Sequence, residues 1–196
     1  MNKIYKKIYP KEVEYQDSKL FEKTMHLSWV EPNMIIKGDT SLDALDNLLP
    51  DILAEFKRLN LATSPFVKFL CIKKIFELIG VIVKFNDGGE GGNKEIGAED
   101  LTPYLNYVLI RACPVNIFTD IKFIKFFLKN EGKLEYDFLN VEIMCKNIME
   151  STYKNYNISE EEYIKKCNEC INDAKNNNDK RFNEIIERLE VVSSNN

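Results

Sequence analysis

The chain has 196 residues, of which 44% are hydrophobic and 30% charged, and its formal net charge is −4. This length fits one or two globular domains, and the composition is that of a soluble protein. The acidic balance, without a basic stripe carrying interleaved aromatic residues, excludes nucleic acid as the expected partner. No apolar run approaches the ~20 residues of a transmembrane helix.

The two properties that bear on location point to the cytoplasm. The first residues are charged and lack an apolar signal core, so secretion is not expected. The five cysteines form no compact framework, which is typical of reduced thiols. The basic arm at residues 3–11 is expected to be a solvated terminus rather than a membrane contact.

The first half of the chain is expected to be helical after a loosely ordered stretch at residues 1–16. A helix then runs to about Trp29. The next helix opens at Ser41 and runs past Pro50, where the proline predicts a kink or two abutting helices. Ser64 as N-cap and Pro65 at the first helical position begin another helix.

A glycine-rich stretch at residues 86–93 follows this helix. It lacks the Gly-Lys-Ser/Thr of a phosphate-binding loop and carries acids that would repel phosphate. We therefore interpret it as a flexible linker.

The stretch 97–114 combines a polar start with a long apolar stripe. Its apolar residues recur at intervals of three and four, which predicts one broad face of an α-helix. Glu99 and Asp100 are expected in the first turn, where unpaired backbone N–H groups favour negative charge. Pro103 is expected in the same turn, since an N–H there has no intrahelical partner. An acidic tip of this kind is by itself an ordinary helix start.

Four further helices are predicted after Pro114. They cover residues 116–129, residues 138–153, a segment with Ser159 as N-cap, and residues 182–192. No segment alternates with the two-residue period of a strand. The predicted fold class is therefore all-α, with about eight helices.

The sequence shows no machinery for covalent, metal or cofactor chemistry. Cys167 and Cys170 form an isolated C-x-x-C, and zinc would need two further ligands. We expect both cysteines to be core residues on one helix face. His26 is the only histidine and has no nucleophile motif near it in the sequence, so a histidine-dependent hydrolase is not expected.

Three stretches carry a family resemblance. Residues 97–108 read GAEDLTPYLNYV, residues 116–124 read NIFTDIKFI, and residues 136–141 read YDFLNV. In this order they resemble the signature stretches of the vacuolar protein sorting nine domain. Matches at residues 29–35, 64–72 and 157–163 extend the resemblance over about residues 25–170.

The resemblance implies a layered multi-helix domain that acts as a guanine-nucleotide exchange factor for a small GTPase of the Rab-five subfamily in endosomal traffic. The protein would be cytoplasmic and peripherally recruited to endosomes, with no cofactor. The implied domain is residues 25–174, between a lead-in at 1–24 and a C-terminal helix at 175–196. The resemblance implies exchange residues Glu99, Asp100 and Tyr136, and GTPase-binding residues Pro103, Tyr104, Tyr107, Leu139 and Asn140.

Two positions depart from the family pattern. Glu99 stands where the family has an aspartate, and Leu139 stands where it has a threonine. The longer side chain has one more torsion to fix, and leucine removes a hydroxyl donor. An alternative function therefore stays open, a Rab-binding scaffold of the same fold with weak or no exchange activity.

Overall fold

Helices make up the secondary structure of the part of the chain that the computed structural model describes, which is residues 11–37, 42–86, 96–128 and 132–176. No strand occurs within these ranges, and the predicted all-α fold class is confirmed. The elements are α2 (Lys11–His26), α3 (Pro32–Ile35), α4 (Asp43–Leu61), α5 (Pro65–Asn86), α6 (Ala98–Ala112), α7 (Ile117–Phe127), α8 (Gly132–Glu150), the 3-10 helix η1 (Tyr153–Tyr156) and α9 (Glu160–Asn176).

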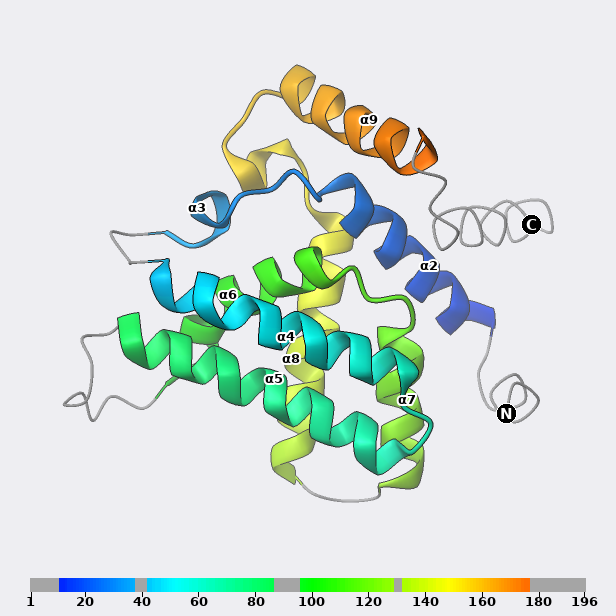
Figure 1. Cartoon of the computed structure of the whole chain (residues 1–196). Helices are drawn as coiled ribbons and strands as arrows, with labels where there is room; N and C mark the ends of the chain where they lie inside the picture. The colour runs from blue at the N-terminus through cyan, green and yellow to red at the C-terminus, as the bar shows by residue number, and fades with distance from the viewer. Residues whose placement is uncertain (1–10, 38–41, 87–95, 129–131, 177–196) are drawn as a thin grey trace.

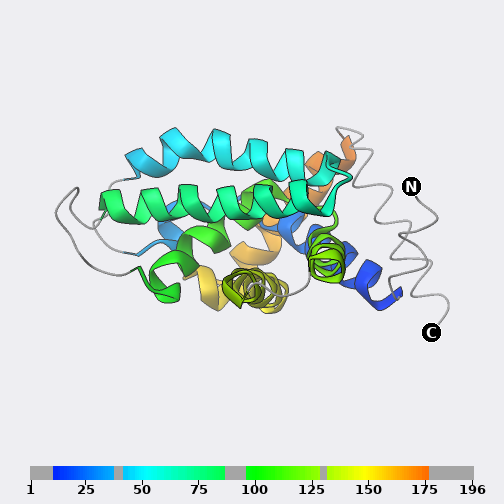
Figure 2. The ribbon, with the colours of Figure 1, turned by 90° about the horizontal axis from the view of Figure 1, so that it is seen from below.

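Helix α6 lies between two layers. Helices α4 and α5 run antiparallel and cover one side of α6, and α8 packs on its opposite side (Figures 1 and 2). This position explains why α6 needs apolar residues around most of its circumference. Its buried residues are Tyr104, Leu105, Tyr107, Val108, Leu109 and Ile110.

Helix α2 begins earlier than the sequence pattern indicated. It starts at Lys11, so the expectation of a loosely ordered segment up to residue 16 is wrong for residues 11–16. Val13 is buried together with Leu20, two helical turns further on. Because α2 packs against α7, α8 and α9, its first turns are held by tertiary contacts that single-sequence periodicity does not reveal.

The proline in α4 does not divide the helix. Pro50 lies inside one continuous helix on an exposed position, so of the two predicted alternatives the pair of abutting helices is wrong, and the kink stays a prediction. The predicted starts of two other helices are confirmed. Helix α5 begins at Pro65, directly after Ser64. At the start of α9 the Ser159 hydroxyl accepts a hydrogen bond from the Glu162 N–H at 3.1 Å.

Two sequence predictions lie outside the described residues, the helix start at Ser41 and the final helix at 182–192. The linker predicted at 86–93 also lies outside them, except for Asn86, which is the last residue of α5. The cysteines are free thiols, and Cys167 is buried as expected. Cys170 is half-buried and its sulfur accepts a hydrogen bond from the Ser28 hydroxyl at 3.1 Å. Across the described residues, no helix is both long and apolar enough to span a bilayer.

Candidate functional site

The acidic tip of α6 has two carboxylates with different surroundings. Asp100 lies in the first turn, and its Oδ2 accepts a hydrogen bond from the Gly97 N–H at 2.9 Å, which is the side-chain half of a capping box. Thr102 donates from its hydroxyl to the Ala98 carbonyl at 2.7 Å. Glu99 is exposed. The tip therefore uses Asp100 to fix the helix start and presents Glu99 to solvent.

Pro103 lies one turn deeper than predicted. It is the sixth residue of α6, so its expected place in the first turn is wrong. A proline there has no N–H to donate to the Glu99 carbonyl, which the i to i−4 pattern would otherwise pair. The helix continues past it because both neighbouring layers hold its later turns.

Glu99 and Pro103 share one face of α6 with Asn106. Residues at these spacings fall within about one-third of the helix circumference. The three side chains are exposed or half-buried, while the residues on the opposite face are buried. The exposed stripe of α6 therefore runs from the acidic tip towards the middle of the helix.

A second stripe lies on α8. Tyr136, Leu139 and Ile143 have 51%, 49% and 41% of their surface exposed, which is unusual for large apolar side chains. Asn140 is half-buried beside them, and Asn147 continues the same face by one more turn. This face points away from the buried side of α8, which packs against α2.

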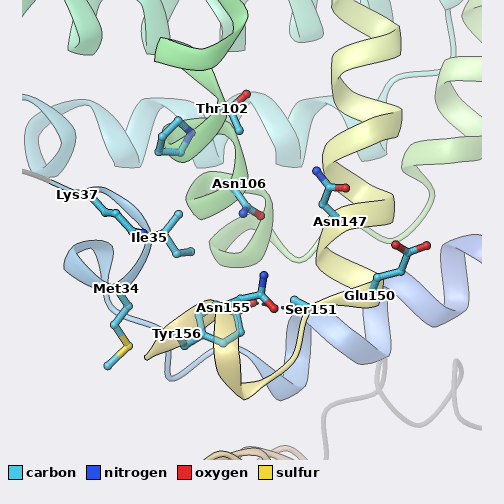
Figure 3. A pocket seen from close by; sticks show the side chains of 11 residues that line it. Met34, Ile35, Lys37, Thr102, Asn106, Asn147, Glu150, Ser151, Asn155 and Tyr156 are labelled. Carbon is cyan, nitrogen blue, oxygen red and sulfur yellow. Dashed lines mark hydrogen bonds between the residues drawn. The ribbon is translucent and has the colours of Figure 1, made fainter. Parts of the chain in front are cut away.

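The two stripes meet at an open pocket of about 440 Å³. Helix α6 contributes Thr102, Pro103 and Asn106 to its wall, and α8 contributes Asn147 and Glu150. The remaining lining residues come from α3, from η1 and from the residues next to them. Figure 3 shows the amides of Asn106 and Asn147 projecting from neighbouring helices around the opening. We call this amide-lined pocket, together with the exposed faces of α6 and α8 that lead to it, the groove between α6 and α8.

Asn106 and Asn147 were not singled out by sequence reasoning. The available signal was a polar residue at helical spacing from Pro103 on an otherwise apolar helix. Asn106 Oδ1 is buried and has no hydrogen-bond partner among the described residues. A buried acceptor left unpaired destabilises a fold by about 1–3 kcal/mol. Stability therefore gives no reason for an asparagine at this position.

Two of the predicted GTPase-binding residues lie in the core instead of the stripe. Tyr104 and Tyr107 are each 6% exposed. The Tyr104 hydroxyl accepts a hydrogen bond from Asn86 Nδ2 at 2.8 Å, which ties α6 to the end of α5. Burial raises the pKa of the Tyr107 hydroxyl, so it remains protonated at neutral pH. Both tyrosines position α6 from behind the exposed stripe.

Charged groups inside the fold connect α5, α7 and α2. Lys68 Nζ lies 2.8 Å from Asp120 Oδ1 and donates to the Leu59 carbonyl at 2.6 Å, and both side chains are about 3% exposed. Asp17 accepts hydrogen bonds from the N–H groups of Phe118 and Thr119 at the start of α7. Burial raises the pKa of Asp17 to about 7 and that of Asp120 to about 6.

The raised pKa of Asp17 predicts that the contribution of this side chain to stability falls as the pH rises from about 4 to about 7. The folded state holds the proton over this interval while the unfolded chain releases it, so the free energy of unfolding falls with pH. We expect Asp17→Asn to flatten this dependence, leaving the smaller contribution of Asp120. Urea unfolding followed by circular dichroism at pH 5 and pH 7.5 measures the change in the free energy of unfolding for both proteins. An equal change in the unmodified protein and in Asp17→Asn would show that Asp17 is not its source.

Within the described residues, no group of three or more His, Cys, Asp or Glu side chains is arranged to hold a metal ion. An all-helical domain that carries an acidic helix tip, an open pocket and a stripe of exposed apolar side chains on α8 is suited to binding another protein. The chemistry available at this groove is charge, hydrogen bonding and apolar contact.

The family model of the vacuolar sorting protein 9 (VPS9) domain matches residues 49–163, which is more than half of the chain and extends from α4 into α9. The chain belongs to this family, whose members are guanine-nucleotide exchange factors for Rab GTPases. A small GTPase is accordingly its partner class. A comparison with curated proteins gave no match.

Proposed function

We propose that the protein accelerates GDP release from a Rab-five-subfamily GTPase at endosomal membranes, using the groove between α6 and α8. The observation that carries the proposal is the placement of Glu99. Its carboxylate is exposed at the rigid start of α6, on the same helix face that leads to Pro103 and the pocket. A group mounted on a helix tip keeps its position better than one on a loop.

Charge explains how Glu99 would act on a bound GTPase. Nucleotide and Mg²⁺ stabilise the loaded GTPase through contacts to its phosphates. A carboxylate inserted beside these phosphates repels them and competes for their cationic partners. Because binding is linked in both directions, an exchange factor that weakens nucleotide binding is itself bound best by the nucleotide-free GTPase.

The apolar stripe of α8 would supply the affinity. Tyr136, Leu139 and Ile143 place large exposed side chains beside the groove. Because these side chains are about half exposed, burying the rest on binding contributes about 1 kcal/mol each before the costs of association. The stripe would therefore hold the GTPase while Glu99 acts at the nucleotide.

Release of a fluorescent GDP analogue from a panel of Rab GTPases tests this proposal. We expect acceleration on Rab-five-subfamily members and little on unrelated Rabs. Acceleration confined to another Rab class would overturn the subfamily assignment and leave the exchange mechanism in place. No acceleration on any member would favour the scaffold alternative, which the departures at Glu99 and Leu139 motivate.

Asn106→Leu separates binding from folding at the pocket. The substitution removes a buried acceptor that has no partner, so we expect the free energy of unfolding to stay the same or rise by up to about 1 kcal/mol. If the pocket receives the GTPase, affinity for the nucleotide-free form falls about tenfold, as expected for one lost polar contact. Chemical denaturation and a pull-down on the same preparation measure the two effects, and unchanged affinity would remove the pocket from the interface.

A further inference from the structure

A second exposed apolar surface lies apart from the groove, where α7 ends and where α4 turns into α5. Phe126 and Phe127 in the last turn of α7 are 57% and 49% exposed. Leu61 at the end of α4 is 73% exposed, and Phe66 in the first turn of α5 is 55% exposed. We call these four residues the apolar end.

The helices that carry these residues come together at one end of the molecule. Helix α5 packs against α7, and the buried Lys68–Asp120 ion pair joins their first halves. Figures 1 and 2 both place the last turn of α7 beside the turn between α4 and α5. The apolar end is thus presented by two adjacent helical segments on a rigid support.

The exposed rings are held in place by aromatic neighbours. The Phe127 ring centroid lies 5.0 Å from those of Phe123 and Phe126, in edge-to-face arrangements. Phe66 similarly contacts Phe69, with centroids 6.0 Å apart. Because packing already restricts these rings, they lose little conformational entropy when a binding partner buries them.

Two exposed lysines lie next to this surface. Lys57 lies one helical turn before Leu61 on α4, and Lys122 lies one turn before Phe126 on α7. Lys57 and Lys122 are exposed, whereas Lys125 is paired with Glu142 at 3.1 Å. Exposed aromatic rings flanked by lysines are the composition that binds an anionic lipid surface, where rings enter the acyl boundary and ammonium groups stay among the headgroups.

We propose that the apolar end docks the protein on anionic membranes by inserting Phe126 and its neighbouring apolar side chains. Charge complementarity selects a lipid surface over a second copy of this acidic chain, because the lysines would be matched by anionic headgroups all around the rings. Docking at this end keeps the groove between α6 and α8 on a different face, so the surface does not depend on the exchange activity proposed above.

Vesicle co-sedimentation of the full chain tests the proposal, with vesicles of phosphatidylcholine alone or with one-third phosphatidylserine. We expect binding to the anionic vesicles only, weakened at high salt. Replacing Leu61, Phe66 and Phe126 together by serine is expected to weaken partitioning by at least about tenfold, since each apolar side chain contributes to insertion. The matched control is Phe85→Ser, a 59% exposed ring at the far end of the same helix α5, which leaves binding unchanged.

A second variant keeps the test independent of folding. In Phe126→Trp, an indole that enters the bilayer shows a blue-shifted emission that brominated lipids quench, whereas Phe85→Trp shows no added quenching. No binding of the unmodified chain, or equal quenching of the two variants, would overturn the proposal. Slower nucleotide exchange by the triple serine variant on a GTPase in solution would also overturn it, since the surface would then contact the GTPase.

Discussion

Glu99→Ala is expected to slow nucleotide release by about a hundredfold while leaving the fold intact. Removal of a single polar or charged group that acts on developing charge in a water-poor site reduces rates by about 10²–10³. Glu99 is exposed, and Asp100 rather than Glu99 closes the capping box at the start of α6. Stopped-flow release of a fluorescent GDP analogue from the responsive Rab measures the change.

Glu161→Ala provides the matched control. Glu161 is also exposed and also occupies the second position of its helix, α9, so its loss removes the same favourable interaction with a helix dipole. We expect the Glu161→Ala variant to accelerate nucleotide release from the GTPase as much as the unmodified protein does. Glu99→Asp keeps the charge but shortens the side chain by one CH₂. The rate of nucleotide release with this variant shows whether the length of the side chain or only its charge matters. Equal rates for Glu99→Ala and the unmodified protein would contradict the assigned role.

Lys68→Met is expected to lower the free energy of unfolding by about 3–5 kcal/mol at neutral pH, because it leaves a buried carboxylate without its cation. The Leu59 carbonyl loses its lysine donor in the same step. Asp120 Oδ2 already lacks a hydrogen-bond partner among the described residues, so the fold offers no second donor there. Urea unfolding followed by circular dichroism measures the loss.

The pH dependence of this variant identifies its cause. With Lys68 present, the pKa of Asp120 is raised by burial to about 6, and Lys68 is the main influence holding it down. Without Lys68 that pKa rises further. At pH 5 the carboxyl is largely protonated with or without Lys68, so the variant loses less stability there than at pH 7.5. Lys73→Met on the exposed face of the same helix is the control, with an expected change below about 0.5 kcal/mol. The same loss at both pH values would point to packing instead of charge.

Much of the local structure followed from the sequence because its causes are local. Ser64 and Pro65 marked the start of α5, Ser159 capped α9, and three- and four-residue apolar spacing predicted α6 and α8. The errors arose where tertiary contacts overrode local signals. The first turns of α2 are stabilised by their neighbours, and α4 accommodates Pro50 on its solvent side.

The sequence also determined the family, because the motifs around Glu99, Asp120 and Tyr136 occur along the chain in the order that the family has. It determined an acid-tipped helix as well, because two carboxylates after a glycine satisfy the unpaired N–H groups of a helix start whatever surrounds them. Neither inference required knowledge of which helices pack together.

Only the tertiary structure decided which residues of the motif face outward. Tyr104 and Tyr107 are buried because the α4–α5 pair covers their side of α6. Asn106 lines a pocket because α8 and α3 leave an open space on its side of α6. The Lys68–Asp120 ion pair joins residues on two different helices, and no local pattern links them. A side chain's exposure and partners depend on the other elements packed around it, so its spacing along one helix determines a face but not what that face meets.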